Sequence, residues 1–115
     1  MKSGIAFEQG EIVLVPFPFT GLENSRQRPV LVLSSTETDK SSVDFVCCGV
    51  TSNVQNTGRS VLVDNNSLER GYLPKQSRIK VGVVFTLEKS LAIKSMGKVK
   101  PSVFKDVKEE FLKLF

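Results

Sequence analysis

The sequence contains no histidine, and this absence limits the chemistry that the protein can perform. Histidine is the commonest zinc ligand and the usual acid–base group near neutral pH. The only cysteines, Cys47 and Cys48, are adjacent, and the alternation of a strand would turn them to opposite faces. We therefore expect no metal and no cofactor, with both cysteines as small apolar side chains in a reducing compartment. Any catalysis has to proceed without an imidazole.

The sequence also lacks a long apolar run. No stretch approaches the length that crosses a bilayer, and none that could serve as a signal peptide follows Met1-Lys2-Ser3-Gly4. We therefore expect a soluble, cytoplasmic protein with no membrane partner. A chain of 115 residues with an apolar fraction of 40% can bury a modest core, so a single domain over residues 1–115 is predicted.

Negative charge is in deficit. Sixteen Lys and Arg residues stand against twelve Asp and Glu residues, which gives a formal net charge of +4. Such a surface favours an anionic partner such as a nucleic acid, but many small basic proteins bind none. The charge alone leaves both possibilities open.

What the sequence does contain is a series of short apolar segments of strand length. No internal repeat or linker divides them, and no helical period lies between them. The second is apolar throughout, which predicts burial on both faces, and Gly82 in the fifth indicates a bulge or bend. Short strands with short connections favour a compact, strongly bent antiparallel barrel over a doubly wound sheet. The expected strands are Gly10–Pro16, Val30–Ser34, Val43–Val50, Val61–Asn66, Ser77–Phe85 and Met96–Lys100.

Two later segments fit helices. Thr86–Leu91 fits a short one, and a longer one follows Ser102, whose hydroxyl suits an N-cap. In the longer one, apolar residues recur at spacings of three and four, and Glu109 and Lys113 form an i,i+4 pair. This apolar stripe packs on the barrel in one interpretation, and in the other a second subunit covers the apolar area left at Phe115. The stripe consists of Phe104, Val107, Phe111 and Leu114.

Five segments in a fixed order carry a family resemblance. They are GEIVLVPFPFT (residues 10–20), RPVLVLS (28–34), GVTSN (49–53), LPKQS (73–77) and FTLEKSL (85–91). Together they resemble the PemK/MazF family of toxins from toxin–antitoxin systems, over about residues 10–100, and their order is more specific than any one segment. The resemblance implies a mainly β fold with short helices, an SH3-like small antiparallel barrel of the PemK/MazF/CcdB kind with a C-terminal helix.

The resemblance also implies a function. Proteins of this kind are homodimers that cut single-stranded RNA at preferred sequences without a metal, and a cognate antitoxin holds them inactive and binds DNA with them. The expected chemistry is attack of the ribose 2'-hydroxyl on the neighbouring phosphate, which leaves a 2',3'-cyclic phosphate and a 5'-hydroxyl. We expect the antitoxin to be a short separate chain whose acidic, partly disordered tail covers the basic groove.

Two residues correspond to the family's essential arginine and threonine, namely Arg28 and Thr51. A guanidinium can donate two parallel hydrogen bonds to the phosphate oxygens that gather negative charge in the transition state, and the start of a buried strand would hold Arg28 still. The Thr51 hydroxyl could bind the same phosphate or orient the 2'-hydroxyl. No residue is an evident general base, so catalysis would depend mainly on positioning and charge, with Glu23 as a spare candidate.

Further residues are candidates for binding the substrate. The first loop and its borders supply Phe17, Thr20, Glu23 and Arg26, the turn after the third strand supplies Ser52 and Asn53, and a basic stripe with Lys75 supplies Arg78 and Lys80. Alternate spacing would aim Arg78 and Lys80 the same way.

Each candidate has a structural alternative. Arg28 could pair with a carboxylate at the barrel rim, and the turn at Thr51 could be an ordinary polar turn whose side chains bond their own backbone. The basic stripe could be a solvated face. The aromatic residues that could stack on bases could equally pack in the core or over it; they are Phe17, Phe19 and Tyr72.

One segment departs from the family pattern. Many members carry an acidic residue, then Gln, and an Arg before the threonine of this segment, whereas here Gly82-Val83-Val84-Phe85 precede Thr86, and Lys80 is the nearest basic residue. Three functions therefore stay open. They are an endoribonuclease toxin, a toxin that poisons a protein target such as gyrase from the same barrel, and a binding module for RNA or antitoxin that has lost turnover.

Overall fold

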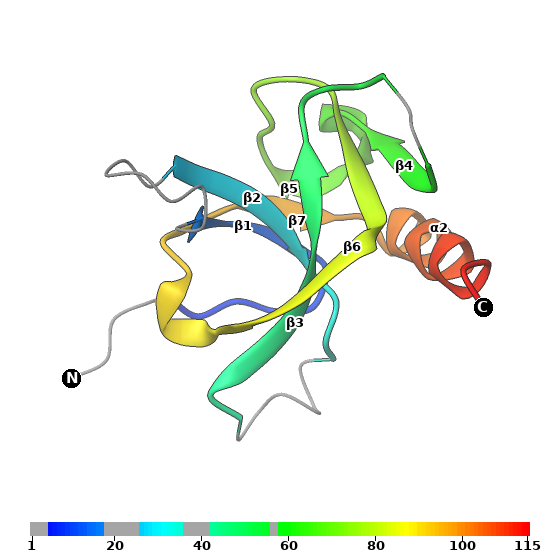
Figure 1. Cartoon of the computed structure of the whole chain (residues 1–115). Coiled ribbons are helices and arrows are strands. Elements are labelled where there is room, and N and C mark those ends of the chain that lie inside the picture. Colours follow the sequence, from blue (N-terminus) through cyan, green and yellow to red (C-terminus); the bar gives the residue numbers. More distant parts are fainter. Residues whose placement is uncertain (1–4, 18–25, 36–41, 56–57) are drawn as a thin grey trace.

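Seven antiparallel strands and one C-terminal helix make up the fold in the computed structural model, which describes residues 5–17, 26–35, 42–55 and 58–115 (Figure 1). The strands are β1 (Glu11–Phe17), β2 (Arg26–Val32), β3 (Asp44–Thr51), β4 (Ser60–Val63), β5 (Leu68–Gly71), β6 (Ser77–Glu88) and β7 (Lys94–Val99). Two short 3-10 helices, η2 (Asn65–Ser67) and η3 (Lys89–Leu91), and the helix α2 (Pro101–Leu112) complete the described elements.

The sheet curls into a half-barrel because its two edge strands are neighbours in the chain. The strand order is β4-β6-β3-β2-β1-β7-β5, so β4 and β5 form opposite edges, yet only Asp64–Ser67 separate them. At this corner the Asn66 amide donates to Asp64 Oδ1 (2.9 Å) and the Asp64 amide donates to Ser67 Oγ (3.0 Å), which form a capping box at the start of η2. The predicted mainly β antiparallel barrel with a C-terminal helix is confirmed.

The core divides into two clusters, one on each face of the sheet. Cys48 belongs to the cluster that α2 covers, and Cys47 to the cluster on the other face, as strand alternation predicts. Val30 and Leu31 divide between the same clusters, which confirms that the apolar run of β2 is buried on both faces. Burial raises the pKa of both cysteine thiols to about 12, so neither is a reactive thiolate near neutral pH.

Strand β6 contains the bulge that Gly82 predicts. The register of the β3–β6 pair places Cys48 opposite Val84 but Gly49 opposite Lys80, so the residues between Lys80 and Val84 have no partner on β3. The strand bends sharply along its length in Figure 1. The bulge therefore separates β6 into a first half that pairs with β4 and the end of β3, and a second half that pairs with the start of β3.

The structure corrects several of the expected elements, and the expected strand Val61–Asn66 ends at Val63. Strand β2 begins at Arg26, not Val30, because β1 pairs with it as far as Arg26. Strand β6 runs on to Glu88 in place of the expected helix over 86–91, because β3 supplies a pairing partner for Val84–Glu88 and leaves only η3 as helix. Strand β5 was not expected, since its four residues carry no apolar alternation.

Strand β5 is positioned by two facing glycines. Gly71 and Gly97 pair across β5 and β7 with φ values of 95° and 155°. A Cβ built on Gly71 would lie 2.3 Å from Cα of Gly97, so no larger residue fits without moving the backbone. This close approach joins the β5 edge to the rest of the sheet.

Helix α2 packs its apolar stripe on the chain's own sheet. Val107 is 1% exposed, and Phe104 and Phe111 pack against the same cluster, so the interpretation of self-packing is confirmed for them. The helix begins at Pro101 with Lys100 as its N-cap, so Ser102 is not the cap. At 12 residues it is too short to span a membrane, and no other helix in the described ranges is longer.

The predicted Glu109–Lys113 pair on α2 does not form. Glu109 pairs instead with Lys105, one turn earlier, at 2.9 Å. Lys113 lies just beyond the last helical turn and pairs with Glu110 at 3.1 Å, and Glu110 also binds Arg59 ahead of β4 at 3.1 Å.

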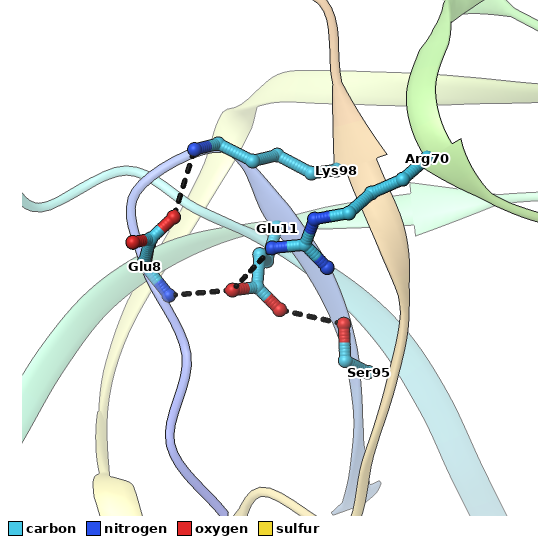
Figure 2. A network of polar contacts seen from close by, with 5 residues as sticks. All are labelled: Glu8, Glu11, Arg70, Ser95 and Lys98. Carbon is cyan, nitrogen blue, oxygen red and sulfur yellow. Dashed lines mark hydrogen bonds and ion pairs between the residues drawn. The ribbon is translucent and has the colours of Figure 1, made fainter.

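A network of polar contacts joins the N-terminal segment to β1, β5 and β7 (Figure 2). The Glu11 carboxylate is only 4% exposed and accepts hydrogen bonds from the Glu8 amide (2.9 Å), Ser95 Oγ (2.6 Å) and Arg70 Nη2 (3.3 Å). Lys98 Nζ donates to Glu8 Oε1 at 2.8 Å, and this hydrogen bond is the main cause that lowers the pKa of Glu8. We call these five residues the polar network.

Candidate nucleic-acid interface

Arg28 and Thr51 lie on one face of the sheet, at the same end. Val30 of β2 pairs with Gly49 of β3, which puts these two residues on a common face. Arg28 stands two residues before Val30, and Thr51 two residues after Gly49, so alternation returns both to that face. The register thus puts the two residues that the resemblance makes catalytic on one face, at the same end of the sheet.

The two strands separate where these residues lie. The β2–β3 pairing ends at Val30 and Gly49, and the strands diverge toward Arg26 and the tip of β3 in Figure 1. Arg28 remains anchored from the other side, because it pairs with Val15 of β1, and it is the third residue of β2 rather than the first. Its side chain is exposed, whereas Thr51 is half-buried.

Arg78 and Lys80 extend the same face across β6. The register places Arg78 opposite Thr51 and Lys80 opposite Gly49. Both side chains are half-buried, and the residues that alternate with them are buried on the other side, which confirms that the two point the same way. We call Arg28, Thr51, Arg78 and Lys80 the cationic cluster.

The turn after β3 is held by its own side chains. The Asn53 amide donates to Thr51 Oγ1 at 3.1 Å, and the Gln55 amide donates to Asn53 Oδ1 at 3.1 Å. The ordinary polar turn considered for Thr51 is therefore present, and Ser52 and Asn53 are exposed on it. The arrangement is compatible with substrate contact, because a threonine oxygen that accepts from an amide keeps its own proton to donate.

Arg78 makes contacts that the sequence did not indicate. Its Nε donates to the Val54 carbonyl at 2.6 Å, and its Nη1 donates to Ser60 Oγ at 3.2 Å. Val54 is 24 residues from Arg78 and Ser60 is 18 residues away. No spacing or motif relates these positions, so only the folded sheet could reveal them.

The cationic cluster lacks acidic partners among the residues with described positions. Five ion pairs are formed there, and none includes Arg28, Arg78 or Lys80. The alternative that Arg28 pairs with a rim carboxylate therefore finds no support among them. In the same ranges no group of three or more His, Cys, Asp or Glu residues could hold a metal ion.

Several candidates cannot be placed. Thr20, Glu23 and Phe19 lie outside the described residues, and so do the side chains of Phe17 and Arg26, whose backbones pair across β1 and β2. Tyr72 is 66% exposed next to β7, where its amide donates to the Met96 carbonyl (2.9 Å), so it does not pack in the core.

The segment that departs from the family pattern is apolar and exposed. Val83 and Val84 are 43% and 41% exposed at the β6 bulge. Phe85 packs against the cluster that contains Cys47, and Lys80 lies at the near side of the bulge. Two exposed valines thus occupy the segment that departs from the expected family pattern.

These observations define a small, curled antiparallel sheet with a cationic cluster at one end. A family model described as a PemK-like, MazF-like toxin of type II toxin-antitoxin systems matches residues 8–115. The chain therefore belongs to this toxin family. A search of curated proteins finds no match.

Solved structures share the fold at low sequence identity. An endoribonuclease from a mycobacterial species superposes with a TM-score of 0.73 at 14% identity, over 96% of this chain and 91% of that one. A MazE–MazF structure from Deinococcus radiodurans gives 0.72 at 18% identity, over 96% and 95%. The Mycobacterium tuberculosis toxin MazF-mt6 gives 0.72 at 16% identity, over 90% and 93%. At these identities the likeness establishes the fold.

Proposed function

We propose that the protein is a growth-inhibiting toxin that cleaves single-stranded RNA in the cytoplasm without a metal. The observation that carries the proposal is the cationic cluster, in which a threonine hydroxyl lies between cations that no described carboxylate neutralises. A phosphodiester supplies the negative charge that such a cluster lacks. The endoribonuclease among the structures of the same fold supports this function.

In the proposed reaction the ribose 2'-hydroxyl attacks the adjacent phosphorus, and the 5'-oxygen of the next nucleotide leaves. Arg28 donates two hydrogen bonds to the non-bridging oxygens as their charge grows. The Thr51 hydroxyl donates to the same phosphate or orients the 2'-hydroxyl, and Lys80 adds positive charge from β6. The products are a 2',3'-cyclic phosphate and a 5'-hydroxyl.

Positioning replaces a histidine base in this proposal. Arginine stays protonated at neutral pH and threonine is a weak base, so neither removes the proton of the 2'-hydroxyl readily. A fixed phosphate geometry and stabilised charge lower the barrier instead. The first-loop residues Phe17, Thr20, Glu23 and Arg26, with Ser52 and Asn53, are proposed to bind the RNA around the cleaved bond.

Two protein partners complete the proposal. An antitoxin with an acidic segment would cover the cationic cluster, and one structure of the same fold is titled an endoribonuclease in complex with its cognate antitoxin. Leu112, Leu114 and Phe115 are 66%, 45% and 89% exposed, which supports a homodimer in which a second copy covers this end of the chain. Sedimentation that gives only monomer at micromolar concentration would contradict the homodimer.

The deciding experiment maps the ends of a long RNA after incubation with the purified protein in EDTA. We expect cuts at a short preferred sequence with 2',3'-cyclic phosphate ends, and none with Arg28→Ala protein of unchanged circular dichroism. Intact RNA together with growth arrest and trapped topoisomerase would replace the proposal by a gyrase poison. RNA binding without cleavage at large protein excess would replace it by a binding module.

The binding module is the second candidate, because a specific feature favours it. Val83 and Val84 expose apolar surface where many family members carry charged side chains. Two valines can bind a base or a protein side chain but cannot stabilise a developing charge. Single-turnover measurements at a protein excess would reveal even a slow residual cleavage, and their failure would favour this second candidate.

A further inference from the structure

Arg78 belongs to the cationic cluster, but its guanidinium is engaged with the protein. Nε donates to the Val54 carbonyl at 2.6 Å and Nη1 donates to Ser60 Oγ at 3.2 Å. We propose that Arg78 is a positioning residue, which fixes the turn at Thr51–Gln55 and through it the Thr51 hydroxyl, rather than a direct contact to a substrate phosphate. Its role in the reaction depends on the proposed function, whereas its hold on the turn does not.

A continuous chain of bonds connects Arg78 to Thr51. The Asn53 amide donates to Thr51 Oγ1, and the Gln55 amide donates to Asn53 Oδ1. Val54 lies between these residues, and its carbonyl accepts from Arg78. The β3–β6 pairing holds the start of the turn, since Thr51 stands opposite Arg78, and the guanidinium holds its far end. Among the described residues, the side-chain hydrogen bonds that would remain in the turn without the guanidinium are the local ones at Thr51 and Asn53.

The contact requires arginine in particular. Its two acceptors belong to different elements, because Val54 follows β3 whereas Ser60 begins β4. A planar guanidinium presents Nε and Nη1 in a fixed geometry and can bind both acceptors at once. A lysine carries the same charge on a single nitrogen, so it would keep the electrostatic attraction to RNA while losing the rigid link.

This difference separates the two possible roles. Lysine would largely preserve a contact that binds an RNA phosphate mainly by charge, and glutamine would reduce the salt dependence of RNA binding by about 0.7 in log–log slope. A positioning residue depends on geometry, so lysine and glutamine would both impair it. In Arg78→Lys the log–log salt slope of RNA binding would be unchanged, because the positive charge remains.

The first test needs no activity. Hydrogen exchange of the Asn53 and Gln55 amides would be measured by NMR in the wild type, in Arg78→Lys and in the control Arg59→Lys. Arg59 also lies beside Ser60, but it pairs with Glu110 on α2. We expect exchange at least about 10-fold faster in Arg78→Lys and little change in Arg59→Lys. Unchanged exchange in Arg78→Lys would overturn the proposal.

The second test measures cleavage by the same proteins. We expect kcat to fall about 10- to 100-fold in Arg78→Lys with KM and the melting temperature close to wild type, because the threonine hydroxyl is misplaced while the charge remains. Ser60→Ala, which removes one acceptor, should give a smaller fall in kcat. A wild-type kcat in Arg78→Lys, with a raised KM in Arg78→Gln, would identify a phosphate contact instead. If the wild type does not cleave RNA, the proposed function fails and the exchange measurement alone decides the role of Arg78.

Discussion

The polar network and the cationic cluster use the same kinds of side chain in opposite ways. In the polar network, Arg70 and Lys98 each face a carboxylate, and the buried Glu11 has three donors (Figure 2). In the cationic cluster, no described carboxylate reaches Arg28, Arg78 or Lys80. A cation that faces a carboxylate contributes to folding, whereas a cation such as Arg28 or Lys80, which no described carboxylate neutralises, is available to an anionic ligand.

The largest expected effect comes from replacing one arginine by alanine in each region and comparing the two variants. Arg28→Ala should reduce RNA cleavage by about 100- to 1000-fold, because it removes donors to the developing phosphate charge, and should leave the melting temperature unchanged. Arg70→Ala should lower the melting temperature and leave the cleavage rate unchanged, since it leaves Glu11 without its cation. Single-turnover rates and thermal melts of the two variants test the contrast. Equal losses of activity in both would abolish the distinction between the regions.

The next effect concerns stability alone. Glu11→Ala should lower the free energy of unfolding by about 1–3 kcal/mol, because Ser95 and the Glu8 amide lose their acceptor in a nearly buried place. Glu109→Ala is the matched control, since its partner Lys105 lies on the exposed side of α2, and it should leave the urea midpoint unchanged. If the two variants unfolded at the same urea concentration, the polar network would have no special role.

A smaller effect is expected at Lys80. Lys80→Gln should weaken RNA binding several-fold and reduce the log–log salt slope by about 0.7, because one phosphate contact is lost. Lys100→Gln removes the same charge from the N-cap of α2 and should leave the slope unchanged. Fluorescence anisotropy over a salt series measures both. A salt slope that Lys80→Gln leaves intact would place Lys80 outside the interface.

The smallest effect should be that of pH on the rate. A sequence without histidine gives no reason for an inflection near 6.5, and the cysteine thiols, with pKa values of about 12, stay protonated. Stopped-time assays from pH 6 to 8 check this. A bell-shaped profile centred near 6.5 would require a carboxyl group with a raised pKa.

Acid should weaken the Glu8–Lys98 ion pair of the polar network. Its hydrogen bond to Lys98 lowers the pKa of Glu8, so this contribution to stability is complete above the ordinary glutamate value of about 4.3 and is lost as the pH falls through the lower folded value. The same ion pair raises the pKa of Lys98, and that contribution is lost only as the pH rises through the folded value of the lysine. In urea titrations below pH 5, the stability contributed by this ion pair should fall with pH in the wild type and be absent at every pH in Glu8→Gln.

Much of the fold could be predicted because it rests on local pattern. The alternation in β3 sends Cys47 and Cys48 to opposite faces, the apolar run in β2 is buried on both, and Gly82 lies in a bulge. The predictions of secondary structure fail where pairing with a strand distant in the sequence decides the local conformation. The segment over 86–91 fits a short helix by its sequence, but pairing with β3 draws half of it, Thr86–Glu88, into β6. The four residues of β5 form a strand by pairing with β7, where Gly71 and Gly97 approach closely.

By itself the sequence determined the chemical character of this protein, a small β fold without histidine that carries excess positive charge. Its resemblance to the toxin family indicated Arg28 and Thr51 as candidate catalytic residues. The tertiary structure decided which of its cations are already paired. It placed Arg78 against Val54 and Ser60, and it left the cationic cluster without a described carboxylate. The reason is physical, since the energy of a charge depends on which groups lie within a few ångströms, and only strand register brings residues from distant parts of the chain that close.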